Sequence, residues 1–216
     1  MWNEARSNAP GAASALAQRA AGEVWQESPL VGVSDLLKAH QASASKQFSL
    51  SERPFRDLVN LRGDANDPAF RSAVESVTGC RPPARPNTVA RGNGYDVLWL
   101  GPDEWLVRSD QRQSATLEAK LTQALTGQFA SAVDIGSGYT VLEASGEKVR
   151  DVIARGCPLD LHPRVFAPGQ CAQSHYFKAS IVLIALSGDT FELVVRRSFA
   201  DYFCRIMLDA AAPLMS

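Results

Sequence analysis

The segment VLWLGPDEWLV, from Val97 to Val107, contains two apolar runs that are separated by a short polar stretch. Pro102 and Asp103 suit the second and third positions of a reverse turn, so the segment predicts two antiparallel strands joined in a hairpin. Trp99 and Trp105 flank this turn. We expect both indole rings to pack on the face of the sheet, whereas an exposed pair would indicate a surface that contacts another protein.

The same turn brings together the carboxyl groups of Asp103 and Glu104. A pair that works as general acid and general base needs burial or a like-charged neighbour to separate its two pKa values. The tip of a turn offers neither. We therefore expect both carboxylates to lie in solvent at the corner of the hairpin and to take no part in catalysis.

Apolar periodicity and capping residues predict further strands and helices on both sides of the hairpin. Asp67 followed by Pro68 is typical of the start of a helix, and Gly79 is typical of its end. Leucines spaced four residues apart after the hairpin place an apolar face on a second helix. The predicted strands cover 56–63, 97–107, 139–145 and both sides of 187–189, and the predicted helices cover 66–79, 114–127 and 146–156.

The C-terminal residues predict one more helix. It is expected to begin at Ser198, with Asp201 three residues later as a weak capping box. Phe199, Phe203 and Ile206 then share one face of this helix.

The order of the predicted elements occurs twice along the chain. Gly79-Cys80 corresponds to Gly156-Cys157, and Leu106-Val107-Arg108 corresponds to Val194-Val195-Arg196. We therefore predict an α+β fold of two repeated strand-helix-strand-strand-helix units, with antiparallel-rich sheets and helices packed on one face. The predicted parts of this one compact body are an N-terminal arm at residues 1–46, a first unit at 47–130 and a second unit at 131–216.

Composition excludes several classes of function. The chain has 216 residues, of which 45% are apolar, and a formal net charge of −1 without a dense run of Lys or Arg, so nucleic acid is not an expected partner. The longest apolar stretch, Ile181 to Leu186, is far shorter than the roughly 20 residues that span a membrane. The first residues show no apolar signal core, so we expect a cytoplasmic protein.

Cysteine and histidine residues in the second unit supply the atoms of a tetrahedral zinc site. Cys157, His162, Cys171 and His175 do not follow the paired spacing of structural zinc motifs, however. The alternative is that Cys157 closes a helix end and Cys171 begins a strand. We expect no bound metal, and we expect reduced thiols because the four cysteines lie far apart.

The sequence contains no nucleotide-binding or nucleophile motif, so we predict no catalytic and no cofactor-binding residue in this chain. Instead, the loop from Cys157 to His175 combines apolar side chains with Arg, a composition that the cores of protein interfaces favour. Within it we predict a partner interface at Leu161, His162, Arg164 and Phe166. Alternatively, the apolar residues of this loop cover their own sheet.

Several segments resemble the gamma subunits of heterotetrameric sarcosine oxidases from about Glu27 to the C-terminus. The segments are DPAFRSAV, PNTVARGNG, LWLGPDEWLV, VDIGSGYTVLEASG, RGCPLDLHPRVFAPGQCAQ and FELVVRRSFADYF, of which CPLDLHP and RRSFADY contain the most distinctive parts. The resemblance implies a fold related to the folate-binding region of the glycine-cleavage T-protein, which is itself built from repeated units.

The resemblance also implies a function. The implied complex of alpha, beta, gamma and delta chains oxidises sarcosine to glycine with oxygen, forms hydrogen peroxide and passes the one-carbon unit to tetrahydrofolate. FAD, FMN and NAD are expected in the alpha and beta subunits and zinc in delta, with none in this chain. The chain is then a non-catalytic subunit of an oxidoreductase acting on CH-NH donors, with alpha as its main partner. An autonomous folate-binding or aminomethyl-transferring enzyme of the T-protein type is the alternative.

Overall fold

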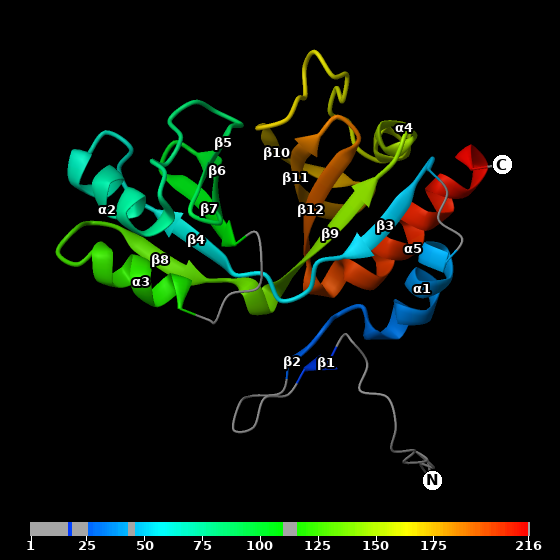
Figure 1. Cartoon of the computed structure of the whole chain (residues 1–216), viewed down its shortest axis with the longest axis horizontal. Coiled ribbons are helices and arrows are strands. Elements are labelled where there is room, and N and C mark those ends of the chain that lie inside the picture. The colour runs from blue at the N-terminus through cyan, green and yellow to red at the C-terminus, as the bar shows by residue number, and fades with distance from the viewer. Residues whose placement is uncertain (1–16, 19–25, 43–45, 110–115, 216) are drawn as a thin grey trace, which may run out of the picture.

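The computed structural model describes residues 17–18, 26–42, 46–109 and 116–215, which contain two antiparallel five-stranded sheets (Figure 1). The first sheet has the strand order β5 (Val89–Gly92), β6 (Tyr95–Gly101), β7 (Glu104–Ser109), β4 (Leu58–Arg62) and β8 (Ser131–Asp134). The second sheet has the order β10 (Cys171–Tyr176), β11 (Ala179–Ser187), β12 (Thr190–Arg196), β9 (Tyr139–Ser145) and β3 (Ser49–Glu52). The short strands β1 (Ala17–Gln18) and β2 (Gln26–Glu27) pair with each other.

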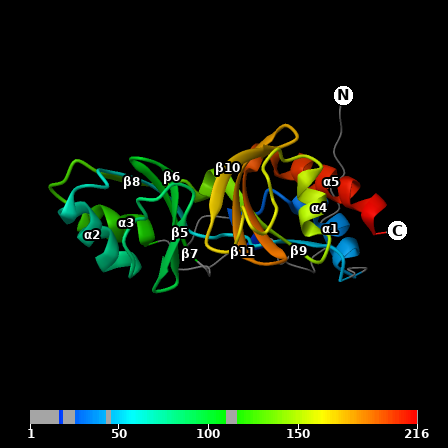
Figure 2. The ribbon, with the colours of Figure 1, turned by 90° about the horizontal axis from the view of Figure 1, so that it is seen from above.

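Helices cover the outer face of each sheet, so that helices, first sheet, second sheet and helices follow one another (Figure 2). Helices α2 (Pro68–Thr78) and α3 (Leu117–Ala124) lie on the first sheet, and α1 (Ser34–Ala42), α4 (Val149–Ala154) and α5 (Ala200–Ala211) lie on the second. Four short 3₁₀ helices complete the described elements: η1 (Val31–Val33), η2 (Gly136–Gly138), η3 (Arg197–Phe199) and η4 (Ala212–Leu214). The predicted α+β class with two repeated units is confirmed.

The two inner sheet faces pack against each other around a separate apolar cluster. Its buried members are Leu58, Leu98, Leu106, Val141, Cys171, Ile184 and Val194. Backbone hydrogen bonds also join the edges β5 and β10, because Val89 N donates to Gly169 O at 2.9 Å and Cys171 N donates to Asn87 O at 3.0 Å. Both faces of the central strands are therefore buried, one under helices and one against the opposite sheet.

The two units exchange their fifth strands. β8 directly precedes β9 in the chain but pairs with β4 of the first sheet, whereas β3 precedes β4 but pairs with β9 of the second sheet. The structural units therefore do not follow the predicted boundaries at residues 47 and 131. β8 and β3 form hydrogen bonds with the otherwise open edges of β4 and β9. The residue pattern within a strand does not specify which other strand will pair with it.

Part of the predicted N-terminal arm contributes to a core. Leu30, Val33 and Leu37 are buried in the cluster beneath the second sheet, and α1 packs against β3. Residues 1–16 and 19–25, for which the sequence predicted an extended arm, lie outside the described residues.

Local sequence signals account for most of the remaining elements. Asp67 caps α2 by accepting a hydrogen bond from Ala69 N at 2.8 Å, and Gly79 follows with a left-handed φ of 73°. Trp99 and Trp105 face each other across the predicted hairpin, and Trp105 is fully buried. The short edge strand β5 was not predicted, since its sequence lacks clear alternation, whereas β10 begins at Cys171, as the alternative to a zinc site expected.

The start of the last helix was predicted wrongly. Residues Arg197–Phe199 form a 3₁₀ turn, and α5 begins at Ala200 without a side-chain cap. Asp201 accepts a hydrogen bond from Arg205 instead of closing a capping box. Phe199 is 38% exposed, whereas Phe203 is buried as expected.

Candidate functional site

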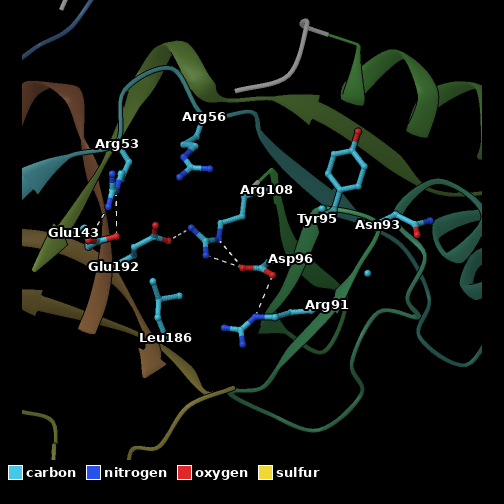
Figure 3. A pocket seen from close by; sticks show the side chains of 12 residues that line it. Arg53, Arg56, Arg91, Asn93, Tyr95, Asp96, Arg108, Glu143, Leu186 and Glu192 are labelled. Atoms are coloured by element: carbon cyan, nitrogen blue, oxygen red, sulfur yellow. Dashed lines mark hydrogen bonds and ion pairs between the residues drawn. The ribbon is translucent and has the colours of Figure 1, made fainter. Parts of the chain in front are cut away.

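A cavity of about 530 Å³ opens between the two sheets, and residues of both sheets line it (Figure 3). Arg91 on β5, Asp96 on β6 and Arg108 on β7 come from the first sheet. Glu143 on β9 and Glu192 on β12 come from the second. Lining residues outside these strands include Arg53 and Arg56 from the segment between β3 and β4.

A buried ion network crosses the boundary between the sheets at the centre of this cavity. Arg108, whose side chain is 3% exposed, donates through Nε and Nη2 to Asp96 Oδ2 at 3.1 and 2.6 Å. Its Nη1 donates to Glu192 Oε2 on the opposite sheet. Burial lowers the pKa of Arg108, and the adjacent Asp96 opposes this shift. The guanidinium therefore links the two halves of the molecule as well as neutralising two buried carboxylates.

Two further arginines stand at the rim of the cavity. Arg53 donates through Nε and Nη2 to the two carboxylate oxygens of Glu143, at 3.1 and 2.8 Å. Arg91 forms an ion pair through Nε with Asp96 Oδ1 at 3.2 Å. Both side chains are close to half exposed, at 43% and 45%. Each guanidinium is thus held along one edge while it still contacts the cavity.

The charged groups of this lining are suited to binding an anion. Each of the three lining carboxylates is paired with an arginine, so the cavity presents guanidinium groups as its main functional groups. Guanidinium groups bind carboxylates and phosphates through paired N–H donors. Among the described residues that line the cavity, none is a serine, cysteine, histidine or lysine.

The charged residues of this site were not identified from the sequence. The available signal was a charged side chain within a strand that is otherwise apolar, as for Asp96, Arg108 and Glu192. Such a residue needs a partner when both faces of the sheet are buried. The identity of that partner depends on the contact between the sheets, which the sequence pattern does not specify.

The carboxyl groups singled out in the sequence lie away from the cavity, at the hairpin corner. Asp103 is exposed and forms an ion pair with Arg62 at 3.4 Å. Glu104 contacts the same arginine at 2.9 Å and accepts a hydrogen bond from Asn60 at 2.7 Å. Asp103 thus lies in solvent as expected, whereas Glu104 belongs to β7 and its side chain is only 26% exposed.

The cysteine and histidine residues of the second unit do not form a ligand set. Within the described ranges, no group of three or more His, Cys, Asp and Glu side chains is arranged to hold a metal ion. Cys157 Sγ contacts Ser174 Oγ at 3.5 Å, whereas Cys171 Sγ lies 3.6 Å from Thr88 O. Burial raises the pKa of the Cys171 thiol to about 11.

The predicted partner interface divides into buried and exposed residues. Leu161 and Phe166 are each 6% exposed and belong to the apolar core of the second half. His162 and Arg164 are exposed, as is Val165 at 53%. Arg150 holds this loop from within by donating through Nη1 to the carbonyl oxygens of Leu161 and Phe166.

No helix in the described part of the chain is long and apolar enough to cross a membrane.

Comparisons with known proteins identify a common family. The family model described as "Sarcosine oxidase, gamma subunit family" matches residues 62–213. Sarcosine oxidase subunit gamma of Corynebacterium sp. (strain P-1) is 29% identical over 177 residues, which cover 82% of this chain and 86% of that protein. The subunit gamma of Arthrobacter sp. is 28% identical over 177 residues, with the same coverage of 82% and 86%.

Two solved structures are similar in fold. One is a chain of the heterotetrameric sarcosine oxidase from Corynebacterium sp. U-96 in complex with pyrrole 2-carboxylate, with a TM-score of 0.80 and 25% identity over 88% of this chain and 97% of that chain. The other is the glycine cleavage system aminomethyltransferase T from Bartonella henselae, with a TM-score of 0.59 and 14% identity over 80% of this chain and 48% of that chain. The second likeness concerns the fold alone.

Proposed function

The chain belongs to the sarcosine oxidase gamma subunit family, and from this premise we propose that it is a non-catalytic assembly subunit of a heterotetrameric sarcosine oxidase. The observation that carries the proposal is the similarity to a chain of the heterotetrameric enzyme, which extends over 88% of this chain and 97% of the other.

The proposed complex contains alpha, beta and delta subunits beside this chain and acts in the cytoplasm. It converts sarcosine and oxygen to glycine and hydrogen peroxide and transfers the one-carbon unit to tetrahydrofolate. FAD, FMN, NAD and zinc reside in the partner subunits. The arginine-paired carboxylates of the cavity support a role without acid-base chemistry, because each carboxylate is already neutralised by a guanidinium group.

The alpha subunit is the proposed direct partner, and the loop from Cys157 to His175 is the proposed contact. Its exposed residues His162, Arg164 and Val165 combine apolar and cationic groups, as residues in interface cores do. The buried Leu161 and Phe166 support this surface from below by fixing the loop to the core.

The alternative of an autonomous folate-binding or aminomethyl-transferring enzyme rests on fold alone, since the likeness to the aminomethyltransferase is at 14% identity. Co-expression separates the two functions. The tagged chain is produced with and without the alpha, beta and delta subunits of its own organism. We expect a yellow complex with sarcosine-dependent peroxide formation only in the co-expression, and no flavin and no turnover by the chain alone. Failure to co-purify, or turnover by the isolated chain, would contradict the proposal.

A further inference from the structure

The cavity between the sheets contains guanidinium donors that the protein does not use. Arg53 makes its two hydrogen bonds through Nε and Nη2, and Arg91 pairs through Nε. Among the described residues, Arg53 Nη1 and both Nη atoms of Arg91 therefore have no acceptor. These donors belong to residues that line one and the same cavity.

The two arginines reach the cavity from different halves of the molecule. Arg91 lies on β5 of the first sheet, whereas Arg53 follows β3 and its backbone N donates to Val141 O of the second sheet at 2.8 Å. Figure 3 shows their side chains on different sides of the Arg108 network. A ligand bound between Arg53 and Arg91 would therefore contact both halves of the molecule.

The orientation of both side chains is set before a ligand arrives. Glu143 holds one edge of the Arg53 guanidinium, and Asp96 holds Arg91 while it is itself fixed by the buried Arg108. Anchored side chains lose less conformational freedom on binding, which favours affinity. A planar guanidinium with free N–H groups is suited to a carboxylate.

The remaining lining limits the charge and size of the ligand. The lining contains four arginines and three carboxylates and so has a formal net charge of +1, which a ligand with one carboxylate balances. Leu186 supplies an apolar contact. A volume of about 530 Å³ falls in the range of small-molecule sites.

We propose that the cavity between the two sheets binds a small molecule with a single carboxylate, and that Arg53 and Arg91 are its guanidinium ligands. The site needs no catalytic group, and it is proposed for the assembled complex as well as for the chain alone.

Titration of the full chain with propionate and benzoate, at an ionic strength held constant with sodium chloride, tests the proposal. Calorimetry should show saturable binding, and Arg53→Gln and Arg91→Gln should each raise the Kd by about tenfold or more, the size expected for a lost charged hydrogen bond. Arg81→Gln is the matched control, since Arg81 pairs with Glu75 outside the cavity, and its Kd should equal that of the wild type. Absence of saturable binding, or wild-type affinity in both cavity variants, would overturn the proposal.

Two further measurements test the charge of the ligand and the role of the planar guanidinium. Inorganic phosphate at the same ionic strength should bind more weakly than propionate, and tighter phosphate binding would overturn the assignment to a single carboxylate. Arg91→Lys keeps the charge but removes the planar donor pair, so a folded variant should still lose affinity.

The titration is then repeated on the assembled complex. Binding of propionate to the assembled complex would support a small-molecule site. Loss of binding on assembly would overturn the proposal and would indicate that a partner subunit fills the cavity.

Discussion

Among single residues, Arg108 has the largest effect on the organisation of the molecule, because it balances one carboxylate from each sheet in a buried position. The guanidinium, Asp96 and Glu192 are each less than a tenth exposed. An isolated charge in such surroundings is costly, whereas a complete network is tolerated. The contact between the sheets therefore depends on all three side chains together.

Replacing Arg108 by Met should lower the free energy of unfolding by about 3–5 kcal/mol, since the buried Glu192 loses its arginine and the buried Asp96 keeps only the half-exposed Arg91. Urea denaturation measures this change. The exposed Arg205→Met is the control and should change stability by less than about 1 kcal/mol. The triple variant Asp96→Asn, Arg108→Met, Glu192→Gln should recover most of the loss, and a triple variant as unstable as Arg108→Met would contradict this account.

Glu52 makes the stability of the protein depend on pH. Burial raises its pKa above the ordinary 4.5, although hydrogen bonds from Thr140 and Ser28 oppose the shift. The folded state therefore holds the proton more tightly than the unfolded state does. The stabilisation from this group is complete below pH 4.5 and is lost as the pH rises through the raised pKa.

Glu52→Gln should remove this dependence, so the variant gains stability relative to the wild type as the pH rises from 4.5 to 7. Urea unfolding at several pH values in this range measures the difference. The exposed Glu147→Gln serves as control and should run parallel to the wild type. A difference between Glu52→Gln and wild type that stays constant with pH would argue against a raised pKa.

At the level of elements, the end of α2 is fitted closely to the strand β5. A Cβ atom placed on Gly92 would lie 2.6 Å from the backbone carbonyl group of Gly79. Gly79 itself adopts a left-handed φ of 73° as the residue that ends the helix. Two glycines therefore permit one helix end to touch one edge strand, and this edge carries Arg91 of the proposed binding site.

Gly92→Ala should destabilise the protein by about 1–3 kcal/mol, because backbone must move to accommodate the methyl group. Gly188→Ala is the control, since no atom lies within 4 Å of the position of its added Cβ. Its effect should stay within about 0.5 kcal/mol. Thermal or urea unfolding of both variants distinguishes close packing from a general intolerance of alanine, and equal stability of the two would contradict the close fit.

At the scale of the whole molecule, the exchange of β3 and β8 and the Arg108 network tie the two halves into one body. Partner binding is then expected on an exposed loop rather than in the space between the sheets. The loop from Cys157 to His175 meets this condition through His162, Arg164 and Val165.

Arg164→Glu combined with Val165→Asp should leave the chain folded but lower its recovery with the alpha subunit by about tenfold or more, through loss of an interface anchor. Quantified co-purification from the co-expressed complex measures the loss. Arg85→Glu combined with Val133→Asp has the same charge change at another exposed arginine and a valine that is also 53% exposed. This control should assemble normally. Normal recovery of the loop variant would exclude the loop as the contact.

The sequence by itself determined the elements whose signals are local. Asp67, Pro68 and Gly79 define the ends of α2, and the alternation around Pro102 defines the hairpin with its buried Trp105. The repeat was predicted from the order in which these local signals occur. The residues of several long segments were sufficient to identify the family. Each of these features depends on residues that are close in the chain or on patterns that recur along it.

The tertiary structure alone decided how the two units combine and where the cavity lies. Pairing of β3 with β9 and of β8 with β4 joins segments that are far apart in the sequence, and β-strand hydrogen bonds carry no residue-specific code. Arg108 and Glu192 likewise meet only after the sheets have packed. The periodicity of a strand shows that a charge is directed toward a buried face, but the partner on that face depends on long-range packing, which no single segment encodes.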